Sequence, residues 1–244
     1  MDGTLTLEEK FNSNLLDTLE KLADAGIDVL IVTGRSAGWV QAIATYLPVV
    51  GAIAENGGLS YTNDTLKPQF ITKISNVDQH RQQLSQLFKL LKDKFPQIKE
   101  SVDNCFRLTD WTFDVADLNQ TELKEINSIC QLEGYGFTYS TVQCHIKPRY
   151  QDKAIALGKV IPEYFPTLKS EQIVTIGDSP NDESLFNPKQ FPISVGVANI
   201  LNYRDRLQHF PRYITTKFEG EVFGELAQLV INHGQRYTAF KRRC

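Results

Sequence analysis

Short, continuous runs of aliphatic residues recur along this chain of 244 residues, and they constrain its fold more than any other feature. Four runs have this character: 28–32, 49–54, 173–176 and 193–197. Strands that are apolar at every position are buried on both faces, which is typical of parallel sheets covered by helices. Segments with helical spacing separate the runs, at 11–23, 38–46, 152–161, 182–186 and 219–232. The sequence therefore predicts an α/β fold with a parallel sheet.

The pattern changes between residues 61 and 148. Two helices are predicted there, one from Val77 to Phe95 and one from Leu123 to Cys130. Each is followed by two runs that alternate in polarity, at 106–108, 111–115, 135–139 and 142–146. Alternation is typical of antiparallel strands with one exposed face. We predict an α/β core domain formed by 1–60 and 149–244, with an α+β domain inserted at 61–148.

Composition and charge exclude several classes of partner. Charged residues make up 23% of the chain and the net charge is -3, so the basic excess of a nucleic-acid binder is absent. No apolar run approaches the roughly 18 residues of a membrane span. The four cysteines have no metal-ligand spacing, which favours reduced thiols: Cys105, Cys130, Cys144 and Cys244. We expect a cytoplasmic protein, monomer or dimer, without nucleic-acid or membrane partners.

Polar clusters follow the predicted strands, where open α/β sheets bind their ligands. Taken singly, three of them have a structural explanation: Asp2-Gly3-Thr4 as a tight turn, Thr33-Gly34-Arg35 as a helix entry, and Lys153 as a solvated helix start. The fourth cluster is Gly177-Asp178-Ser179-Pro180-Asn181-Asp182. It gathers hard oxygen ligands of the kind that Mg²⁺ prefers, and its carboxylates would repel each other without a cation. We predict a magnesium site there.

Taken together and in this order, the four clusters resemble the motifs of the haloacid dehalogenase superfamily. Ala54-Glu55-Asn56-Gly57-Gly58 and Val195-Gly196-Val197-Ala198-Asn199 resemble its Cof-type, sucrose-phosphatase-like branch, subclass IIB. The resemblance covers essentially the whole chain, although the inserted domain agrees only in architecture. It implies a Rossmann-like parallel-sheet core with an inserted C2B-type cap, and a Mg²⁺-dependent phosphatase that forms an aspartyl-phosphate.

The resemblance also implies roles for individual residues. Thr33 and the Gly34 amide would hold phosphoryl oxygens, and Lys153 would neutralise nucleophile and phosphate. Asp178 would bind Mg²⁺ directly, with Asn181 and Asp182 as ligands or beside them. Asp2 would be the general acid and base, and its backbone carbonyl would touch the metal. Predicted substrate contacts are Arg35 and Asn56, with His145, Lys147 and Arg149 as further candidates. For His145 and Lys147, an exposed strand face is the favoured alternative.

The first motif departs from the family pattern Asp-x-Asp-Gly-Thr. Met1 occupies x and Asp2 the second aspartate, so the nucleophilic aspartate would lie directly before Met1. The strand leading to it would be central in the sheet. Its roughly five buried aliphatic residues, at ~1.5–3 kcal/mol each, would be worth about as much as a domain's whole stability of ~5–15 kcal/mol. We therefore expect the natural start to lie upstream.

The expected substrate is a small phosphorylated metabolite, first of all a sugar phosphate. Three alternatives remain open at this point. One is a sugar phosphomutase, which returns the phosphoryl group to its substrate. The second is a catalytically inactive protein that binds phosphate or sugar, and the third is completion of the site by a second chain.

Overall fold

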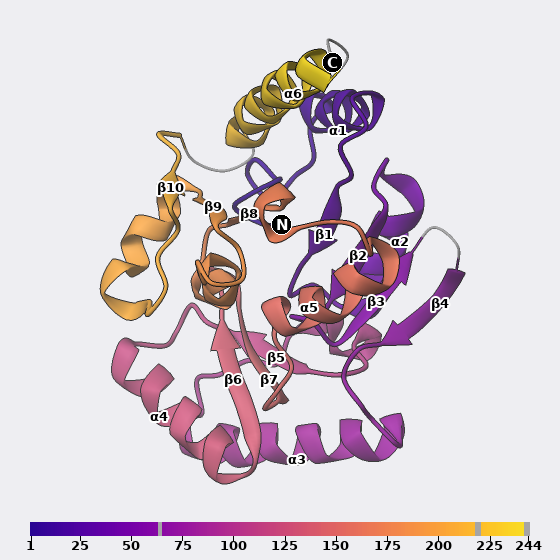
Figure 1. Ribbon diagram of the computed structural model, residues 1–244. Coiled ribbons are helices and arrows are strands. Elements are labelled where there is room, and N and C mark those ends of the chain that lie inside the picture. Colours follow the sequence, from indigo (N-terminus) through magenta and orange to yellow (C-terminus); the bar gives the residue numbers. More distant parts are fainter. Residues whose placement is uncertain (63–64, 218–220, 242–244) are drawn as a thin grey trace.

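The computed structural model describes residues 1–62, 65–217 and 221–241 (Figure 1). Within these ranges the strands form three sheets, two of them carrying parallel strand pairs and one antiparallel throughout. The mixed α/β architecture predicted from the sequence is confirmed.

The first sheet has the strand order β1-β2-β3-β4. Its strands are β1 (Leu30–Val32), β2 (Gly51–Ala54), β3 (Leu59–Thr62) and β4 (Thr65–Phe70). β1 and β2 are parallel, while β3 and β4 continue the sheet as antiparallel neighbours. Helix α2 (Ala37–Tyr46) packs on this sheet through its buried face. The domain boundary predicted at residue 60 falls inside β3, so the sheet itself continues past it.

The second sheet is parallel and has the order β10-β9-β8. Its strands are β8 (Val174–Gly177), β9 (Ile193–Gly196) and β10 (Tyr213–Ile214). β8 and β1 are therefore both edge strands, and within the described residues no backbone ladder joins them. The start of the chain lies between the two strands (Figure 1). Edge strands leave a row of backbone donors and acceptors free to pair with a further strand.

Helices of the core begin at side chains that cap them. Asn12 accepts a hydrogen bond from the Leu15 amide and starts α1 (Ser13–Asp24), which lies beside α6 (Glu221–Lys241). Asp152 likewise caps α5 (Lys153–Tyr164). The predicted start of the last helix, Glu219, lies outside the described residues. Three 3₁₀ segments complete the core: η2 (Ser170–Gln172), η3 (Pro180–Phe186) and η4 (Ala198–Arg206). The helix predicted at 182–186 is thus a 3₁₀ segment.

The third sheet lies in the predicted insert and is antiparallel, with the order β5-β7-β6. Its strands are β5 (Trp111–Asp114), β6 (Tyr135–Tyr139) and β7 (Gln143–Pro148). Helices α3 (Val77–Lys94) and α4 (Gln120–Leu132) cover the face away from the core (Figure 1). Both helices and all three strands contribute to one hydrophobic cluster, which includes Leu84, Phe88, Phe113, Ile126 and Ile146. The insert, called the cap below, therefore has a hydrophobic core of its own.

The strand predicted at 106–108 is wrong. Residues of η1 (Val102–Phe106) form a 3₁₀ turn, and 107–110 form a loop. The reason is a buried acceptor in the core: the Glu55 carboxylate takes the backbone N–H groups of Leu108, Thr109 and Asp110. Donors that are bound to a carboxylate cannot also bind a neighbouring strand.

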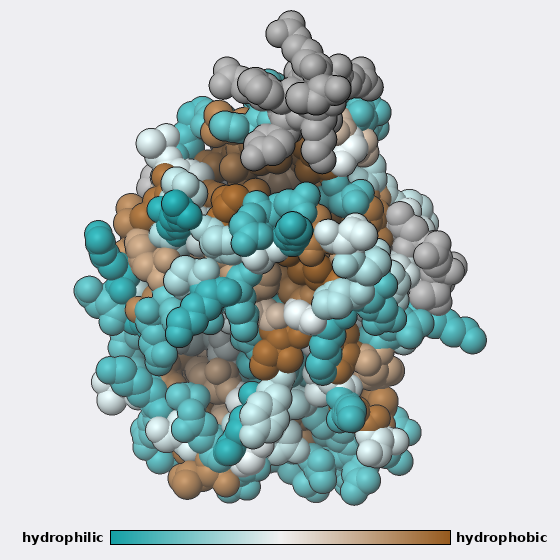
Figure 2. Space-filling view, viewed as in Figure 1, coloured by the Kyte–Doolittle hydropathy of each residue, from teal (hydrophilic) through white to brown (hydrophobic). Residues whose placement is uncertain are grey.

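Hydrophilic residues cover most of the face seen in Figure 2, with hydrophobic ones showing mainly between them. Within the described ranges, no helix is both long enough and apolar enough to cross a membrane. Cys105, Cys130 and Cys144 are free thiols. Cys244, the fourth cysteine of the sequence, lies outside the described residues.

Candidate active site

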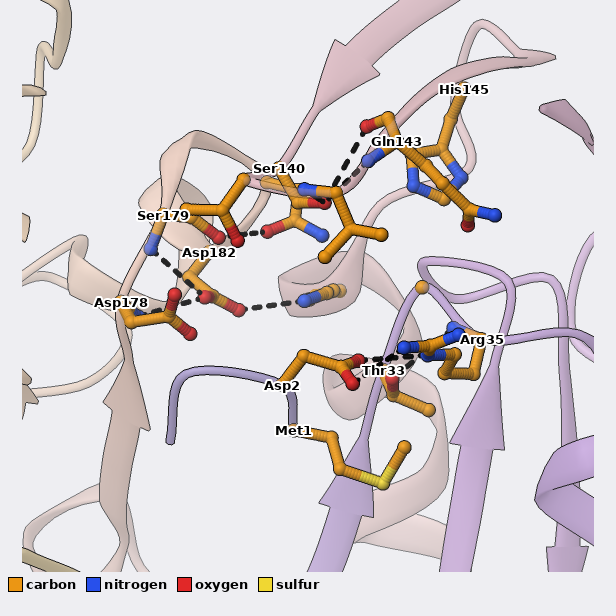
Figure 3. A pocket seen from close by; sticks show the side chains of 15 residues that line it. Met1, Asp2, Thr33, Arg35, Ser140, Gln143, His145, Asp178, Ser179 and Asp182 are labelled. Atoms are coloured by element: carbon orange, nitrogen blue, oxygen red, sulfur yellow. Dashed lines mark hydrogen bonds and ion pairs between the residues drawn. The ribbon is translucent and has the colours of Figure 1, made fainter. Parts of the chain in front are cut away.

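All four polar clusters meet at one pocket between the sheet ends and the cap (Figure 3). The pocket is lined by Met1, Asp2, Thr33, Gly34, Arg35, Ser140, Thr141, Val142, Gln143, His145, Lys153, Asp178, Ser179, Asn181 and Asp182. Its cavity volume of about 30 Å³ leaves room for only a few water molecules. A phosphorylated substrate is larger than that volume, so it can enter only if the turn between β6 and β7 (residues 140–142) or neighbouring side chains move.

Asp178 lies at the end of β8 and is almost fully buried. The Thr4 hydroxyl donates to its Oδ1 at 2.7 Å, and the Asn199 amide donates to its Oδ2 at 3.1 Å. Within the described residues no cationic side chain forms an ion pair with it. Burial, and then the negative charge of Asp182, raise the pKa of Asp178 to about 6. The ionised form of this carboxylate is therefore poorly compensated by its protein neighbours.

The negative charge of Asp182 is balanced by an ion pair, unlike that of Asp178. Lys153 Nζ lies 2.6 Å from Asp182 Oδ1, and both side chains are buried. Asp182 Oδ2 accepts the backbone N–H groups of Asp178 at 3.0 Å and of Ser179 at 3.4 Å. Burial, the largest single effect, would raise the pKa of Asp182, but Lys153, the N-terminal ammonium group and the Asp178 backbone N–H together outweigh it and lower the pKa. Asp182 thus fixes both the lysine and the loop that carries Asp178.

Asp2 and Arg35 form a bidentate ion pair. Arg35 Nε lies 2.8 Å from Asp2 Oδ2 and Arg35 Nη2 lies 2.6 Å from Oδ1. Burial alone would raise the pKa of Asp2, but the paired guanidinium holds it below its usual value. Both residues line the pocket, with Asp2 between Asp178 and Thr33 and Arg35 on the side away from Asp178 (Figure 3). In this structure the predicted acid and base is bound to the predicted substrate contact.

Gly3 allows the first cluster to approach Asp178. Its φ of +70° is a left-handed conformation that side chains rarely adopt. A Cβ built on Gly3 would lie 2.6 Å from Asp178 Oδ2, a severe clash. The glycine of Asp2-Gly3-Thr4 is therefore required both by its backbone angle and by the packing of the neighbouring carboxylate.

Asn56 lies behind the pocket and does not line it. Its Oδ1 accepts from the Asn181 amide at 3.1 Å, while the Ser179 hydroxyl donates to Asn181 Oδ1 at 2.9 Å. Glu55 and Asn56 both have positive φ, at 52° and 55°, a conformation that stores strain in residues other than glycine. The Asn56 Nδ2 atom is buried and has no hydrogen-bond partner among the described residues.

The donor set fits Mg²⁺. This ion is commonly held by one or two carboxylates, with waters or substrate phosphate completing its shell. Asp178 would supply the carboxylate, and Asn181 and Asp182 lie beside it. The described residues hold no group of three or more His, Cys, Asp or Glu side chains that could hold a metal ion. Asn199 Oδ1 is buried without a partner next to Asp178. Sequence reasoning assigned Asn199 no role, although it noted its motif.

The cap contributes residues that sequence reasoning missed. Arg107 is fully buried, and its Nη1 donates to the Gly34 carbonyl at 2.9 Å and to Asp110 Oδ1 at 2.9 Å. Asp110 Oδ2 in turn lies 2.9 Å from His145 Nδ1. No motif pointed to Arg107 or Asp110. A signal is nevertheless present, because two opposite charges stand among the apolar residues from Phe106 to Phe113.

The other cap candidates lie away from the pocket. Lys147 is buried and donates to the Gln151 carbonyl, while Arg149 is exposed and donates to the Gln131 carbonyl. The exposed strand face expected for His145 and Lys147 is wrong, since they are only 1% and 8% exposed. Of the three, only His145 lines the pocket.

Glu55 fastens the cap loop to the core. Its carboxylate accepts the Ala37 amide at 2.9 Å, the Thr109 amide at 2.6 Å and the Thr109 hydroxyl at 2.7 Å. Burial, and then the charge of Asp110, raise the pKa of Glu55. The loop that carries Arg107 and Asp110 is therefore held directly over Gly34.

Comparison with known proteins agrees with this arrangement. Residues 1–94 match the haloacid dehalogenase-like hydrolase family. The chain is 29% identical over 230 residues to a phosphoglycolate phosphatase of Methanothrix thermoacetophila, covering 93% of this chain and 92% of that protein. A solved protein of Thermoplasma acidophilum superposes with a TM-score of 0.73 at 21% identity, with 94% of each chain covered. A solved subclass IIB sugar phosphatase superposes with a TM-score of 0.66 at 14% identity, with 96% of each chain covered.

The fold, the four clusters and these matches agree on one class: residues 1–94 match the haloacid dehalogenase-like hydrolases, and almost the whole chain is similar to phosphoglycolate phosphatases. The enzyme class that these relatives support is a hydrolase of phosphoric monoesters. The solved subclass IIB protein shares the fold. The similarity to this family and the enzyme class, both predicted from the sequence, are confirmed.

Proposed function

We propose that this protein is a Mg²⁺-dependent phosphatase of a small phosphorylated metabolite and works through an aspartyl-phosphate. One observation carries the proposal: residues distant in sequence, from Asp2 to Asp182, line a single pocket at the carboxyl ends of β1 and β8. When bound, Mg²⁺ would neutralise phosphoryl charge that otherwise repels an anionic nucleophile.

The residues have the following proposed roles. Asp178 holds the metal, with Asn181 and Asp182 beside it and the Asp2 carbonyl as a further ligand. Thr33 and the Gly34 amide hold phosphoryl oxygens, and Lys153 neutralises charge next to them. Asp2 protonates the leaving oxygen and later activates water. In the present structure Arg35 holds the Asp2 carboxylate, so we expect substrate binding to displace that ion pair and bring Arg35 and Asn56 toward the substrate.

The nucleophile is proposed to precede Met1 directly. A strand ending in that aspartate would fit between the edge strands β1 and β8, where it would pair with both. Its carboxylate would then emerge next to Thr33 and Asp178, which follow those two strands.

Sugar phosphates remain the predicted substrates, and 2-phosphoglycolate is the first compound to compare with them because of the name of the M. thermoacetophila relative. A phosphomutase would differ from a phosphatase by requiring a bisphosphate activator. The cytoplasmic location, the monomeric or dimeric state and the lack of nucleic-acid and membrane partners stay predictions.

The decisive experiment compares three proteins in a phosphate-release assay with Mg²⁺. They are the printed chain, a form extended by the residues encoded upstream in frame, and that extended form with asparagine in place of the aspartate directly before Met1. We expect release by the extended form alone, and its loss when Mg²⁺ is chelated. Equal activity of all three proteins would contradict the proposed nucleophile. An inert extended form that still binds phosphate would instead favour the non-catalytic alternative.

A further inference from the structure

One ring nitrogen of His145 forms a hydrogen bond inside the cap, and the other faces the pocket. Its Nδ1 lies 2.9 Å from Asp110 Oδ2, and the residue is buried on β7, the central strand of the cap sheet. A Cβ built on Gly34 would lie 3.1 Å from His145 Nε2, so this nitrogen sits directly against the predicted phosphate-binding loop. Among the described residues no hydrogen bond to Nε2 is formed, while the side chain lines the pocket.

Asp110 determines which nitrogen carries the proton. Arg107 Nη1 contacts both carboxylate oxygens of Asp110, at 2.9 and 3.2 Å, which keeps that carboxylate ionised. An ionised carboxylate only accepts, so the imidazole must donate from Nδ1. If the ring is neutral, Nε2 then has a lone pair and no proton.

The surrounding charges keep the ring neutral. Burial, together with the positive charges of Arg107 and Lys153, lowers the pKa of His145 and outweighs the opposing effect of Asp110. Asp103 pairs with Arg107 through Nη2, a guanidinium nitrogen that does not bind Asp110, and it does not contact the imidazole ring. The pocket therefore presents an acceptor at Nε2.

A hydroxyl group can donate a hydrogen bond to this acceptor. A carboxylate or a methyl group cannot, because neither carries a proton to donate to Nε2.

We propose that His145 Nε2 recognises a hydroxyl group next to the phosphoester of the substrate, with Asp110 and Arg107 as positioning residues that fix the imidazole. This inference rests on the proposed phosphatase function and narrows its substrate to hydroxylated, polyol- or sugar-like phosphates.

The tautomer is tested without any turnover. Imidazole nitrogens are observed by NMR in ¹⁵N-histidine-labelled protein at pH 7.5, in the printed chain and in the extended form, with the His145 signals assigned by their loss in His145→Leu. We expect a protonated Nδ1 and an unprotonated Nε2, and mixed tautomers in Asp110→Asn. A protonated Nε2 in the otherwise unaltered protein would overturn the proposal.

Substrate recognition is tested with three compounds that differ in one group: ethyl phosphate, 2-hydroxyethyl phosphate and 2-phosphoglycolate. We expect the extended form to prefer 2-hydroxyethyl phosphate to ethyl phosphate by about tenfold in kcat/KM, the effect of one good hydrogen bond, expressed mainly in KM. His145→Leu is expected to reduce the preference to about twofold or less. Arg149→Gln, a change at an exposed residue just beyond β7, should retain it.

The outcomes separate this inference from the proposed function. Equal rates on ethyl and 2-hydroxyethyl phosphate, or the highest rate on 2-phosphoglycolate, would contradict recognition of a hydroxyl group. Either result would still support phosphatase activity. Absence of turnover on every compound would contradict the proposed phosphatase activity. The NMR measurement would then still test whether His145 Nε2 is unprotonated. Melting curves of His145→Leu show whether a lost preference accompanies a folded protein.

Discussion

Two groups of buried charges lie on opposite sides of the pocket and differ in how they are balanced. The core cluster consists of Lys153, Asp178 and Asp182, and the cap cluster of Asp103, Arg107, Asp110 and His145. In the cap cluster Arg107 pairs with Asp103 and Asp110, at 2.9 Å each. In the core cluster Lys153 pairs with Asp182 at 2.6 Å, while Asp178 has only neutral donors.

This difference suggests different roles: the paired charges of the cap cluster stabilise the fold, whereas the unpaired charge of Asp178 in the core cluster is suited to binding a cation. A buried carboxylate with a paired guanidinium is compensated by the protein itself, whereas an unpaired one is expensive in free energy. The imbalance at Asp178 is therefore what a bound cation would remove. The cap cluster needs no such ion, and its one free acceptor, His145 Nε2, suits a neutral group.

The largest expected effect follows from removing the unbalanced charge. Asp178→Asn in the extended protein should lower Mg²⁺-dependent kcat by about four orders of magnitude or more, which corresponds to ~5.5 kcal/mol of transition-state stabilisation. The metal-free melting temperature should stay equal or rise, because a buried uncompensated charge is lost. Phosphate-release kinetics and thermal unfolding measure the two effects.

Asp205→Asn is the matched control, since Asp205 is exposed and lies outside the pocket. It should change neither quantity. A tenfold or smaller loss of kcat in Asp178→Asn would mean that this carboxylate does not hold the metal.

The second effect follows from breaking the balanced cluster. Arg107→Met should lower the free energy of unfolding by about 3–5 kcal/mol, because it leaves Asp110 buried without its guanidinium. Urea denaturation measures the loss. The double variant Arg107→Met with Asp110→Leu should recover part of it, because no buried charge is then left unpaired. A single variant within about 1 kcal/mol of the unaltered protein, at the scale of a surface ion pair, would show that the cap cluster is not a stabilising unit.

The sequence predicted the core cluster better than the cap cluster, for physical reasons. Asp178 and Asp182 follow a buried strand in one short loop, so their proximity is local and can be read from spacing. Arg107 meets Gly34 only after the cap has folded onto the core, across a separation of 73 residues, and Asp110 meets His145 only after the cap itself has folded, across 35 residues. Spacing carries no information about such contacts.

The same limit explains the errors. The alternation at 106–108 predicts a strand because Phe106 and Leu108 are apolar, yet Glu55 takes the backbone donors of that loop. Glu55 is 53 residues from Leu108, so its competition with a β ladder is invisible locally. For His145 the polar residue type suggested exposure, whereas its charged partners allow burial.

Glu55, which connects the cap loop to the core, gives the smallest of the effects that we expect on stability. Glu55→Gln keeps the shape of the side chain but replaces one acceptor oxygen by an NH₂ donor. That donor would face the N–H groups of Leu108, Thr109 and Ala37, so at least one buried donor would lose its partner, at a cost of about 1–3 kcal/mol in the free energy of unfolding. Lys99→Met, which removes an exposed partner of Asp117, is the control and should cost about 0–1 kcal/mol. If both variants unfold alike in urea, Glu55 does not fasten the cap loop. A loss confined to Glu55→Gln instead locates the stability of the joint in its buried acceptor.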